Sequence, residues 1–298
     1  MSLEKRTGIV IKNYNSYYYV ATGKELVPCK IRGRFKKNKF SLLTGDTVVF
    51  SKPDFDGEGS IEEVLPRKNR LFKPAVANVD QIMLVFAVKN PDFNQNVLDR
   101  FLISVQQAQV PVSICFSKMD LLDSEDELHK VFALYEKIGH KIFKVSAEKQ
   151  TSILTLKEAL KSKTTVFAGL SGAGKSTLLN NLYPGLELAT GEVSLKNSKG
   201  RHTTRFSQLI ATGEGYIVDT PGFSFTDFES FTVNEVEKTF LEFAPYRDEC
   251  RFSGCLHISE PNCAVKTALK EGLIDEVRYD NYLAIINEIK EYEERKFK

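Results

Sequence analysis

The 298-residue sequence contains no apolar run close to the roughly 18 residues that a membrane-spanning helix requires. It also lacks internal repeats and low-complexity linkers, and 42% of its residues are apolar, so we expect three compact, closely joined units. Neither sign of charge is in large excess, since the formal net charge is +2. Affinity for nucleic acid would therefore have to come from clustered cations rather than from the total charge.

Cysteine is scarce and unevenly spread. There are five cysteines, and three of them share residues 250–263 with a histidine in the pattern C-x4-C-x-H-x5-C. Three thiolates and one imidazole suit a tetrahedral zinc ion, and four protein ligands leave no position open for water. We therefore predict one structural zinc ion, with iron as the alternative metal, bound by Cys250, Cys255, His257 and Cys263.

Two other interpretations of the cysteines are weaker. A disulfide is disfavoured because the first residues do not resemble a secretory signal, and we expect a cytoplasmic protein. Scattered buried cysteine is the other alternative for the set. Cys29 and Cys115 lie in apolar predicted strands and are most simply core residues.

A glycine-rich segment fits the phosphate-binding pattern G-x-x-x-x-G-K-[ST] at every fixed position, with a chance turn as the alternative. It follows an apolar run at 164–168 and precedes a predicted helix, which is the context the pattern requires. Its backbone N–H groups would surround the β-phosphate, Lys175 would reach the β- and γ-phosphates, and Ser176 would bind magnesium. The segment consists of Gly169, Leu170, Ser171, Gly172, Ala173, Gly174, Lys175, Ser176 and Thr177.

A second motif, D-x-x-G, closes the apolar run at 215–218 with Asp219 and Gly222. Asp219 would hold the magnesium shell through water, and the Gly222 N–H would meet the γ-phosphate. Such tetrapeptides are common in turns, so this one is informative because it closes a strand downstream of a phosphate loop.

The base-reading motif N-K-x-D does not occur after residue 222, and a related sequence lies upstream instead. The apolar run at 110–116 ends in Ser117, Lys118, Met119 and Asp120. Asp120 would accept hydrogen bonds from guanine N1 and N2. Ser117 replaces the usual Asn, which braces the phosphate loop and approaches the purine N7. The run at 141–145 ends in Ser146 and Ala147, where a backbone N–H would meet guanine O6.

This order of motifs predicts a circularly permuted GTPase domain. Each of the four motifs stands at the carboxyl end of an apolar run, and nucleotides bind at the carboxyl ends of parallel strands in such sheets. Because the phosphate loop does not distinguish the bases, ATP preference is the alternative.

The residue that follows D-x-x-G cannot orient the attacking water in this sequence. Phe223 follows D-x-x-G, where many GTPases carry a Gln that orients the attacking water. The polar segment 199–205 falls where a switch loop is expected. Within it, His202 would orient or deprotonate the water, and Thr204, or alternatively Thr203, would complete magnesium coordination.

We therefore predict His202, Lys175 and Thr204 as catalytic residues. The alternative for His202 is a contact with phosphate, solvent or another macromolecule. Arg201 and Arg205 would either stabilise transition-state charge or bind RNA.

The N-terminal residues have a different pattern. Five short β-prone runs, at 8–11, 17–21, 27–31, 47–50 and 60–64, predict a small barrel, with an OB-fold as the leading candidate. From Lys30 to Phe40 the chain is basic, without acids, and interleaved with phenylalanine. Such a run is typical of a nucleic-acid surface, although a merely solvated basic hairpin is the alternative.

The remaining segments alternate in type. A buried strand is predicted at 78–88 and amphipathic helices at 97–105, 265–271 and 275–296, so the middle of the chain favours a mostly parallel α/β sheet. We predict an OB-fold RNA-binding domain at 1–66, a permuted P-loop GTPase domain at 67–228 and a helical zinc-binding domain at 229–298.

Taken together, the barrel, the permuted motifs and the Cys3His spacing resemble the RsgA (YjeQ) family of ribosome biogenesis GTPases across essentially the whole chain. The resemblance implies a cytoplasmic bacterial enzyme that binds the small ribosomal subunit late in its maturation, hydrolyses GTP when stimulated by it, and then leaves. It also implies rRNA contacts by the barrel and the zinc domain, and a role for His202 in hydrolysis.

Two other functional classes compete with this reading. The first is a nucleotide-controlled RNA- or ribosome-binding protein with negligible hydrolysis, which the absence of Gln after Gly222 favours. The second is a phosphate-loop kinase, for which the sequence from Ser117 to Asp120 would have no use. We expect a monomer with no membrane partner.

Overall fold

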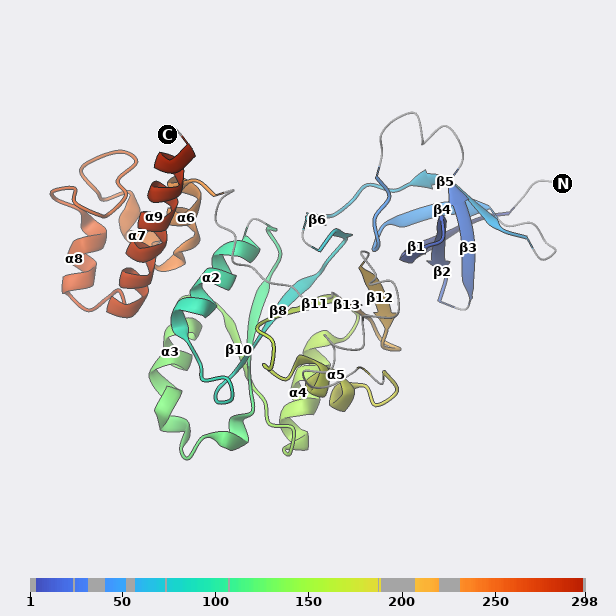
Figure 1. The fold of residues 1–298 in the computed structure, drawn as a ribbon, viewed down its shortest axis with the longest axis horizontal. Coiled ribbons are helices and arrows are strands. Elements are labelled where there is room, and N and C mark those ends of the chain that lie inside the picture. Colours follow the sequence, from blue (N-terminus) through green and yellow to red (C-terminus); the bar gives the residue numbers. More distant parts are fainter. Residues whose placement is uncertain are drawn as a thin grey trace.

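The computed structural model describes residues 4–23, 25–31, 41–51, 57–72, 74–106, 108–186, 188, 207–219 and 231–296. These residues form a β-barrel, a helix-covered sheet and a group of C-terminal helices, in chain order (Figure 1). The barrel and the C-terminal helices lie at opposite ends of the molecule, with the sheet between them. Within these ranges, no helix is both long and apolar enough to cross a membrane.

Five strands close the N-terminal barrel. The order around it is β1-β2-β3-β5-β4, with β3 and β5 parallel and the other neighbours antiparallel. Alternate residues point inward, so Val10, Val20, Phe50 and Ile61 fill the core. This is the five-stranded OB-fold that the sequence predicts. The strands are β1 (Lys5–Tyr14), β2 (Tyr17–Ala21), β3 (Leu26–Ile31), β4 (Thr47–Ser51) and β5 (Gly59–Val64).

The central sheet has the order β10-β9-β8-β11-β13-β12. All neighbours are parallel except β12 and β13, so the predicted parallel sheet is confirmed and the antiparallel edge strand β12 is an addition to it. Every residue of β8 is buried, as expected for an interior strand of a parallel sheet. The strands are β8 (Gln81–Ala87), β9 (Val112–Ser117), β10 (Lys141–Lys144), β11 (Thr164–Ala168), β12 (Gln208–Ala211) and β13 (Tyr216–Asp219).

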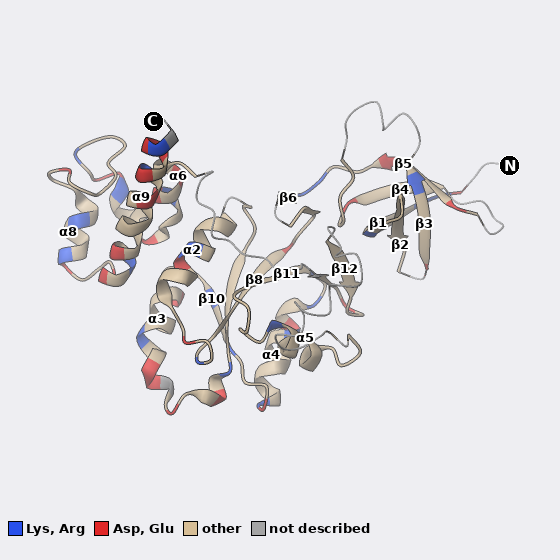
Figure 2. Cartoon of the chain, in the orientation of Figure 1, with Lys and Arg blue, Asp and Glu red and all other residues tan. Residues whose placement is uncertain are grey.

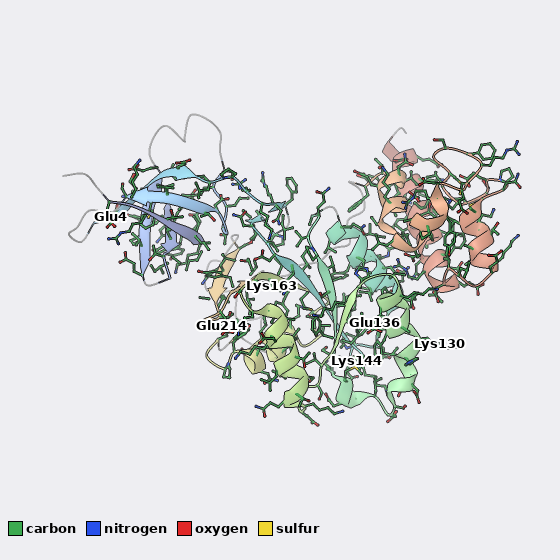
Figure 3. The ribbon with its side chains drawn as sticks, turned by 180° about the vertical axis from the view of Figure 1, so that it is seen from behind. Glu4, Lys130, Glu136, Lys144, Lys163 and Glu214 are labelled. Carbon is green, nitrogen blue, oxygen red and sulfur yellow. The ribbon has the colours of Figure 1, made fainter. Side chains whose placement is uncertain are left out.

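Helices cover both faces of this sheet. One core joins the sheet to α2 (Gln95–Gln106) and α3 (His129–Lys137), and a second joins it to α4 (Gln150–Leu160) and α5 (Lys175–Leu182). The view from behind labels Lys163 at the amino edge of the sheet, before β11, and Lys144 at the carboxyl edge, where β10 ends (Figure 3). All five parallel strands thus end at one edge.

The C-terminal residues form short helices packed on one long helix. They are α6 (Val233–Thr239), α7 (Ala244–Arg247), α8 (Ala264–Lys270) and α9 (Glu276–Lys296). A capping box between Thr232 and Glu235 starts α6. Phe240, Phe243 and Tyr282 pack edge to face or stacked in the centre of the group. The predicted helices at 265–271 and 275–296 correspond to α8 and α9.

Polar contacts join the units. Next to the barrel, the Arg67 guanidinium pairs with the buried Asp46 carboxylate at 2.6 Å, beside the hairpin of β6 (Arg70–Leu71) and β7 (Val76–Ala77). On the other side, Arg278 of α9 pairs with the fully buried Asp99 of α2 at 2.5 Å, and Asn281 donates to the second Asp99 oxygen at 2.6 Å. Helix α2 therefore contacts both the sheet and the C-terminal helices.

Candidate nucleotide site and metal centre

The predicted phosphate loop connects the end of β11 to the start of α5. Its glycines adopt positive φ angles, 146° at Gly169, 78° at Gly172 and 83° at Gly174. A Cβ atom on Gly169 would lie 2.0 Å from the carbonyl oxygen of Val85 in β8. Glycine is required here because the loop passes directly against the neighbouring strand.

Lys175 begins α5 and turns back onto the loop. Its Nζ donates hydrogen bonds to the carbonyl oxygens of Gly169 at 2.8 Å and Leu170 at 2.7 Å. Burial lowers the pKa of the Lys175 ammonium from its ordinary value. A phosphate dianion would be a stronger partner for this cation than two neutral carbonyls.

The predicted base-reading segment contacts the predicted phosphate loop. Ser117, the last residue of β9, donates from Oγ to the carbonyl oxygen of Ala173 at 2.6 Å. The next residue, Lys118, donates from Nζ to the carbonyl oxygens of Gly172, at 2.9 Å, and Asn90. Ser117 thus makes the bracing contact to the phosphate loop that we expected of Asn at this position.

Asp120 lies beside the second predicted base-contacting segment. It belongs to the 3-10 turn Met119–Leu121, and its Oδ1 accepts a hydrogen bond of 2.6 Å from the Ser146 hydroxyl. Ser146 is buried, whereas Asp120 and Ala147 are exposed. The serine therefore orients a carboxylate that is accessible from solvent, as a base reader has to be.

Several predicted residues lie outside the described part of the chain. These are His202, Thr203, Thr204, Arg201, Arg205 and Gly222, together with residues 32–40 of the basic run. The backbone of Asp219 ends β13, which pairs with β11 in parallel, so it reaches the same sheet edge as the phosphate loop. The roles predicted for these residues stay predictions.

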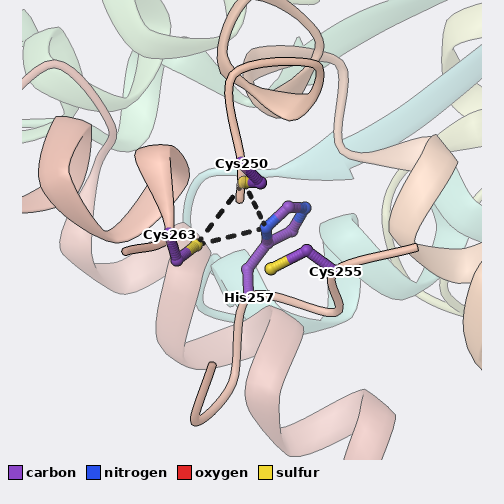
Figure 4. Close-up of side chains that lie close together, drawn as sticks. All are labelled: Cys250, Cys255, His257 and Cys263. Carbon is purple, nitrogen blue, oxygen red and sulfur yellow. Dashed lines mark hydrogen bonds between the residues drawn. The ribbon is translucent and has the colours of Figure 1, made fainter. Parts of the chain in front are cut away.

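The Cys3His set comes together in the C-terminal unit (Figure 4). Its four candidate ligand atoms all lie within 4.8 Å of one another. The Cys250 and Cys263 sulfurs are 3.8 Å apart, and His257 Nδ1 is 3.6 Å and 3.3 Å from them. Tetrahedral zinc with ordinary bond lengths places two sulfurs about 3.8 Å apart and sulfur and nitrogen about 3.6 Å apart. These residues fit a single metal ion.

Burial shapes the chemistry of the thiols. It raises the pKa of Cys255 to about 12 and also raises the pKa of Cys263. A cation at the centre of the set would favour the thiolates, so metal binding would release protons. With three of the four residues buried and four ligands available, the arrangement suits a structural ion rather than a catalytic one.

The polar groups around the set were not predicted from the sequence. Glu260 accepts hydrogen bonds of 2.8 Å from the backbone N–H groups of Leu256 and Ile258, which flank His257. The Tyr279 hydroxyl donates to the His257 carbonyl oxygen at 2.6 Å. His257 has a φ of 58°, in the left-handed region that residues other than glycine seldom adopt. These contacts support that backbone conformation.

Comparisons with known proteins agree with this architecture. The family model described as RsgA GTPase matches residues 64–229, and that described as RsgA N-terminal domain matches residues 7–61. A curated relative from Alkaliphilus metalliredigens, named small ribosomal subunit biogenesis GTPase RsgA, is 44% identical, covering 95% of this chain and 97% of the relative. One of the same name from Carboxydothermus hydrogenoformans is 45% identical, covering 95% and 97%.

Solved structures lead to the same group. The crystal structure of YjeQ from Thermotoga maritima has a TM-score of 0.84 and 40% identity, covering 96% of this chain and 99% of that one. The crystal structure of YloQ, titled a circularly permuted GTPase, has a TM-score of 0.81 and 36% identity, covering 97% and 96%.

Proposed function

Because this chain belongs to the RsgA family of GTPases, we propose that it hydrolyses GTP to GDP and phosphate when stimulated by the small ribosomal subunit. It would bind the rRNA of that subunit late in maturation and dissociate after hydrolysis. The curated relatives carry the name small ribosomal subunit biogenesis GTPase, which supports the choice of partner. We place this activity in the cytoplasm and assign it to a monomer.

The contact between the base-reading segment and the phosphate loop carries the proposal. Ser117 and Lys118 bond to the carbonyls of Ala173 and Gly172, so the segment proposed to read guanine and the loop proposed to hold phosphate form one unit. Asp120, held by Ser146, would then discriminate guanine by accepting from its N1 and N2 groups. A kinase would have no need for such a reader.

Hydrolysis would proceed by attack of water on the γ-phosphorus, with cleavage of the bond to the bridging oxygen and departure of GDP. Lys175 and the loop N–H groups would stabilise the charge on the phosphate oxygens, and Gly222 would contact the γ-phosphate. We propose that His202 orients the water, since Phe223 has no polar group to do so. Bound magnesium, held by Ser176 and Thr204 with Asp219 acting through water, would neutralise charge on the phosphates.

We propose that the two flanking units, the barrel and the zinc domain, bind rRNA. The proposed bounds are 1–66 for the barrel, 67–228 for the GTPase domain and 229–298 for the zinc domain. In the barrel, the Lys12 ammonium lies 4.6 Å from the centre of the Tyr19 ring. Beside the metal ligands, the Arg251 guanidinium lies 5.4 Å from the ring of Phe252, which is 44% exposed. Lysines also line α8 (Figure 2). Paired cations and rings suit phosphates and bases.

Zinc is the metal that we propose for the Cys3His set, because three thiolates and an imidazole this close together and largely buried favour it. Its role would be to hold α6, the ligand segment and α9 together. Residues Cys250, Cys255, His257 and Cys263 would be its ligands.

The test is GTP turnover by the purified chain with and without small ribosomal subunits, with ATP as a control. Strong stimulation with GTP alone, lost in His202→Ala but retained in His129→Ala, is the expected result. His129 is a suitable control because it lies exposed at the start of α3. Tight GTP-dependent subunit binding without stimulated turnover would instead favour a nucleotide-controlled binding protein.

A further inference from the structure

The two nitrogens of the buried His257 ring face different partners. Nδ1 lies among the sulfurs, 3.3 Å from Cys263 and 3.6 Å from Cys250. Nε2 lies on the opposite side of the ring, 3.1 Å from Oε1 of Glu237. The ring is completely inaccessible to solvent, so Glu237 rather than water meets Nε2. This geometry fits a ring that carries its hydrogen on Nε2 and presents the Nδ1 lone pair to the sulfurs.

The Glu237 carboxylate is nearly buried and has a second polar partner. Its side chain is 7% exposed, and the same Oε1 accepts a second hydrogen bond of 2.6 Å from Nε of Arg247. The Arg247 cation offsets the carboxylate charge next to three thiols. Glu237 therefore lies beside the imidazole of His257, and Arg247 offsets part of its charge.

We infer that Glu237 is the positioning residue of the metal centre: it fixes the His257 tautomer and raises the donor strength of Nδ1 toward the metal. Carboxylates that accept the free N–H of a metal-bound histidine act in this way, and their loss costs metal affinity. The inference rests on the metal proposed above, and it concerns a side chain outside the four predicted ligands.

The position of Glu237 in the fold gives this contact a second consequence. Glu237 belongs to α6, the first helix of the described chain after β13, whereas the ligands lie in residues 250–263. Helix α6 also packs on α2 of the sheet-covering layer and on α9. A metal ion held through His257 would thus attach the C-terminal metal segment to the helix that follows the D-x-x-G strand. Loss of the Glu237 contact should loosen this attachment as well as the ion.

The test compares zinc affinity of wild type, Glu237→Gln, Glu237→Ala and Arg247→Met, measured on the full chain by competition with a chromophoric chelator. We expect both Glu237 variants to bind zinc about 10- to 100-fold more weakly, the size of effect seen when such outer carboxylates are removed. Arg247→Met is the matched control, because it removes the other partner of the same oxygen and leaves the contact with His257. It should lose less affinity than either Glu237 variant, because the carboxylate that accepts from His257 is still present.

A second readout separates a positioning role from a merely structural one. Cobalt(II) bound in place of zinc gives an absorption spectrum that depends on its ligands, and we expect it to change in Glu237→Gln but not in Arg247→Met. Equal loss of affinity in both variants, or wild-type affinity and spectrum in Glu237→Gln, would overturn the inference. A wild-type chain that binds no zinc would overturn the proposed metal site itself and the inference with it, so the two failures are distinguishable.

Discussion

The proposed nucleotide site and the proposed metal centre are built in opposite ways. Four residues within residues 250–263 make up the proposed metal centre, and three of them are buried. The proposed nucleotide site consists of segments that follow β9, β10 and β11 at one edge of the sheet. Asp120, Ser171 and Thr177 are exposed there. Its cations, Lys175 and Lys118, bond to carbonyls of the loop itself.

This difference separates a permanent ligand from an exchangeable one. Closed, buried ligands of one chain segment suit an ion that stays with the folded protein. Neutral carbonyl partners can be exchanged for phosphate at little cost, which suits a substrate that binds and leaves. We therefore expect the ion in the Cys3His set to be structural and the ligand at the sheet edge to turn over.

The largest expected effect comes from removing the metal. Structural zinc contributes about 10 kcal/mol to the folding of small zinc domains, so Cys263→Ser should unfold the C-terminal helices. Limited proteolysis should then cut within α8 and α9, while GTP binding measured by titration calorimetry stays close to wild type. Cys115→Ser, a buried cysteine in β9, is the control for loss of a thiol. Full protection of α8 and α9 in the Cys263 variant would contradict the assigned structural role.

The junction between the two regions should be nearly as sensitive. Arg278→Met leaves the fully buried Asp99 without its cation and should destabilise the chain by about 3–5 kcal/mol. Asp99→Asn combined with Arg278→Met should recover part of that loss, because it removes one of the two carboxylates left without a cation, the other being Glu242. Denaturant unfolding of the three proteins is the measurement. A double variant less stable than Arg278→Met alone would show that the pair is not coupled in this way.

Base discrimination is the next effect in size. Asp120→Asn replaces two charge-assisted hydrogen bonds to guanine, and at about 1.5–3 kcal/mol each the affinity for GTP should fall at least tenfold. Affinity for xanthosine triphosphate should rise, because its N1–C2 edge suits an amide. Competition binding with both nucleotides measures the change. Asp123→Asn, an exposed residue nearby, is the control. Unchanged GTP affinity in Asp120→Asn would mean that this carboxylate does not read the base.

The smallest effect is expected at Ser117. Ser117→Ala removes the hydrogen bond to the Ala173 carbonyl, worth about 1 kcal/mol, and should weaken GTP binding several-fold through a looser phosphate loop. Ser113→Ala, another buried serine of β9, should leave binding unchanged. If the two variants bind GTP equally well, the bracing contact has no bearing on the nucleotide site.

Local patterns made much of this molecule predictable from sequence. The phosphate loop and the Cys3His set are short segments whose spacing is fixed by the group they are predicted to bind, and the strands before the nucleotide motifs have apolar centres. The OB-fold barrel followed from five short β-prone runs. The family comparisons and the sheet order confirm the permuted fold that these patterns predicted.

Contacts between distant segments were not predictable in the same way. Glu237 lies 20 residues before His257, and Lys118 lies 54 residues before Gly172. The motif that contains Lys118 indicated a place near the phosphate loop but not the carbonyl that it contacts. Nothing in the local sequence of Glu237 indicates its partner, since Glu is common on exposed helices. The edge strand β12 was not among the predicted elements.

The most direct measurement is the affinity of this chain for small ribosomal subunits. It should be made once with a non-hydrolysable GTP analogue bound and once with GDP bound, at the same salt concentration. If turnover at the sheet edge controls binding, the chain should bind the subunit more tightly with the GTP analogue than with GDP. Equal affinity in the two states would contradict the proposal that hydrolysis releases this protein from the subunit.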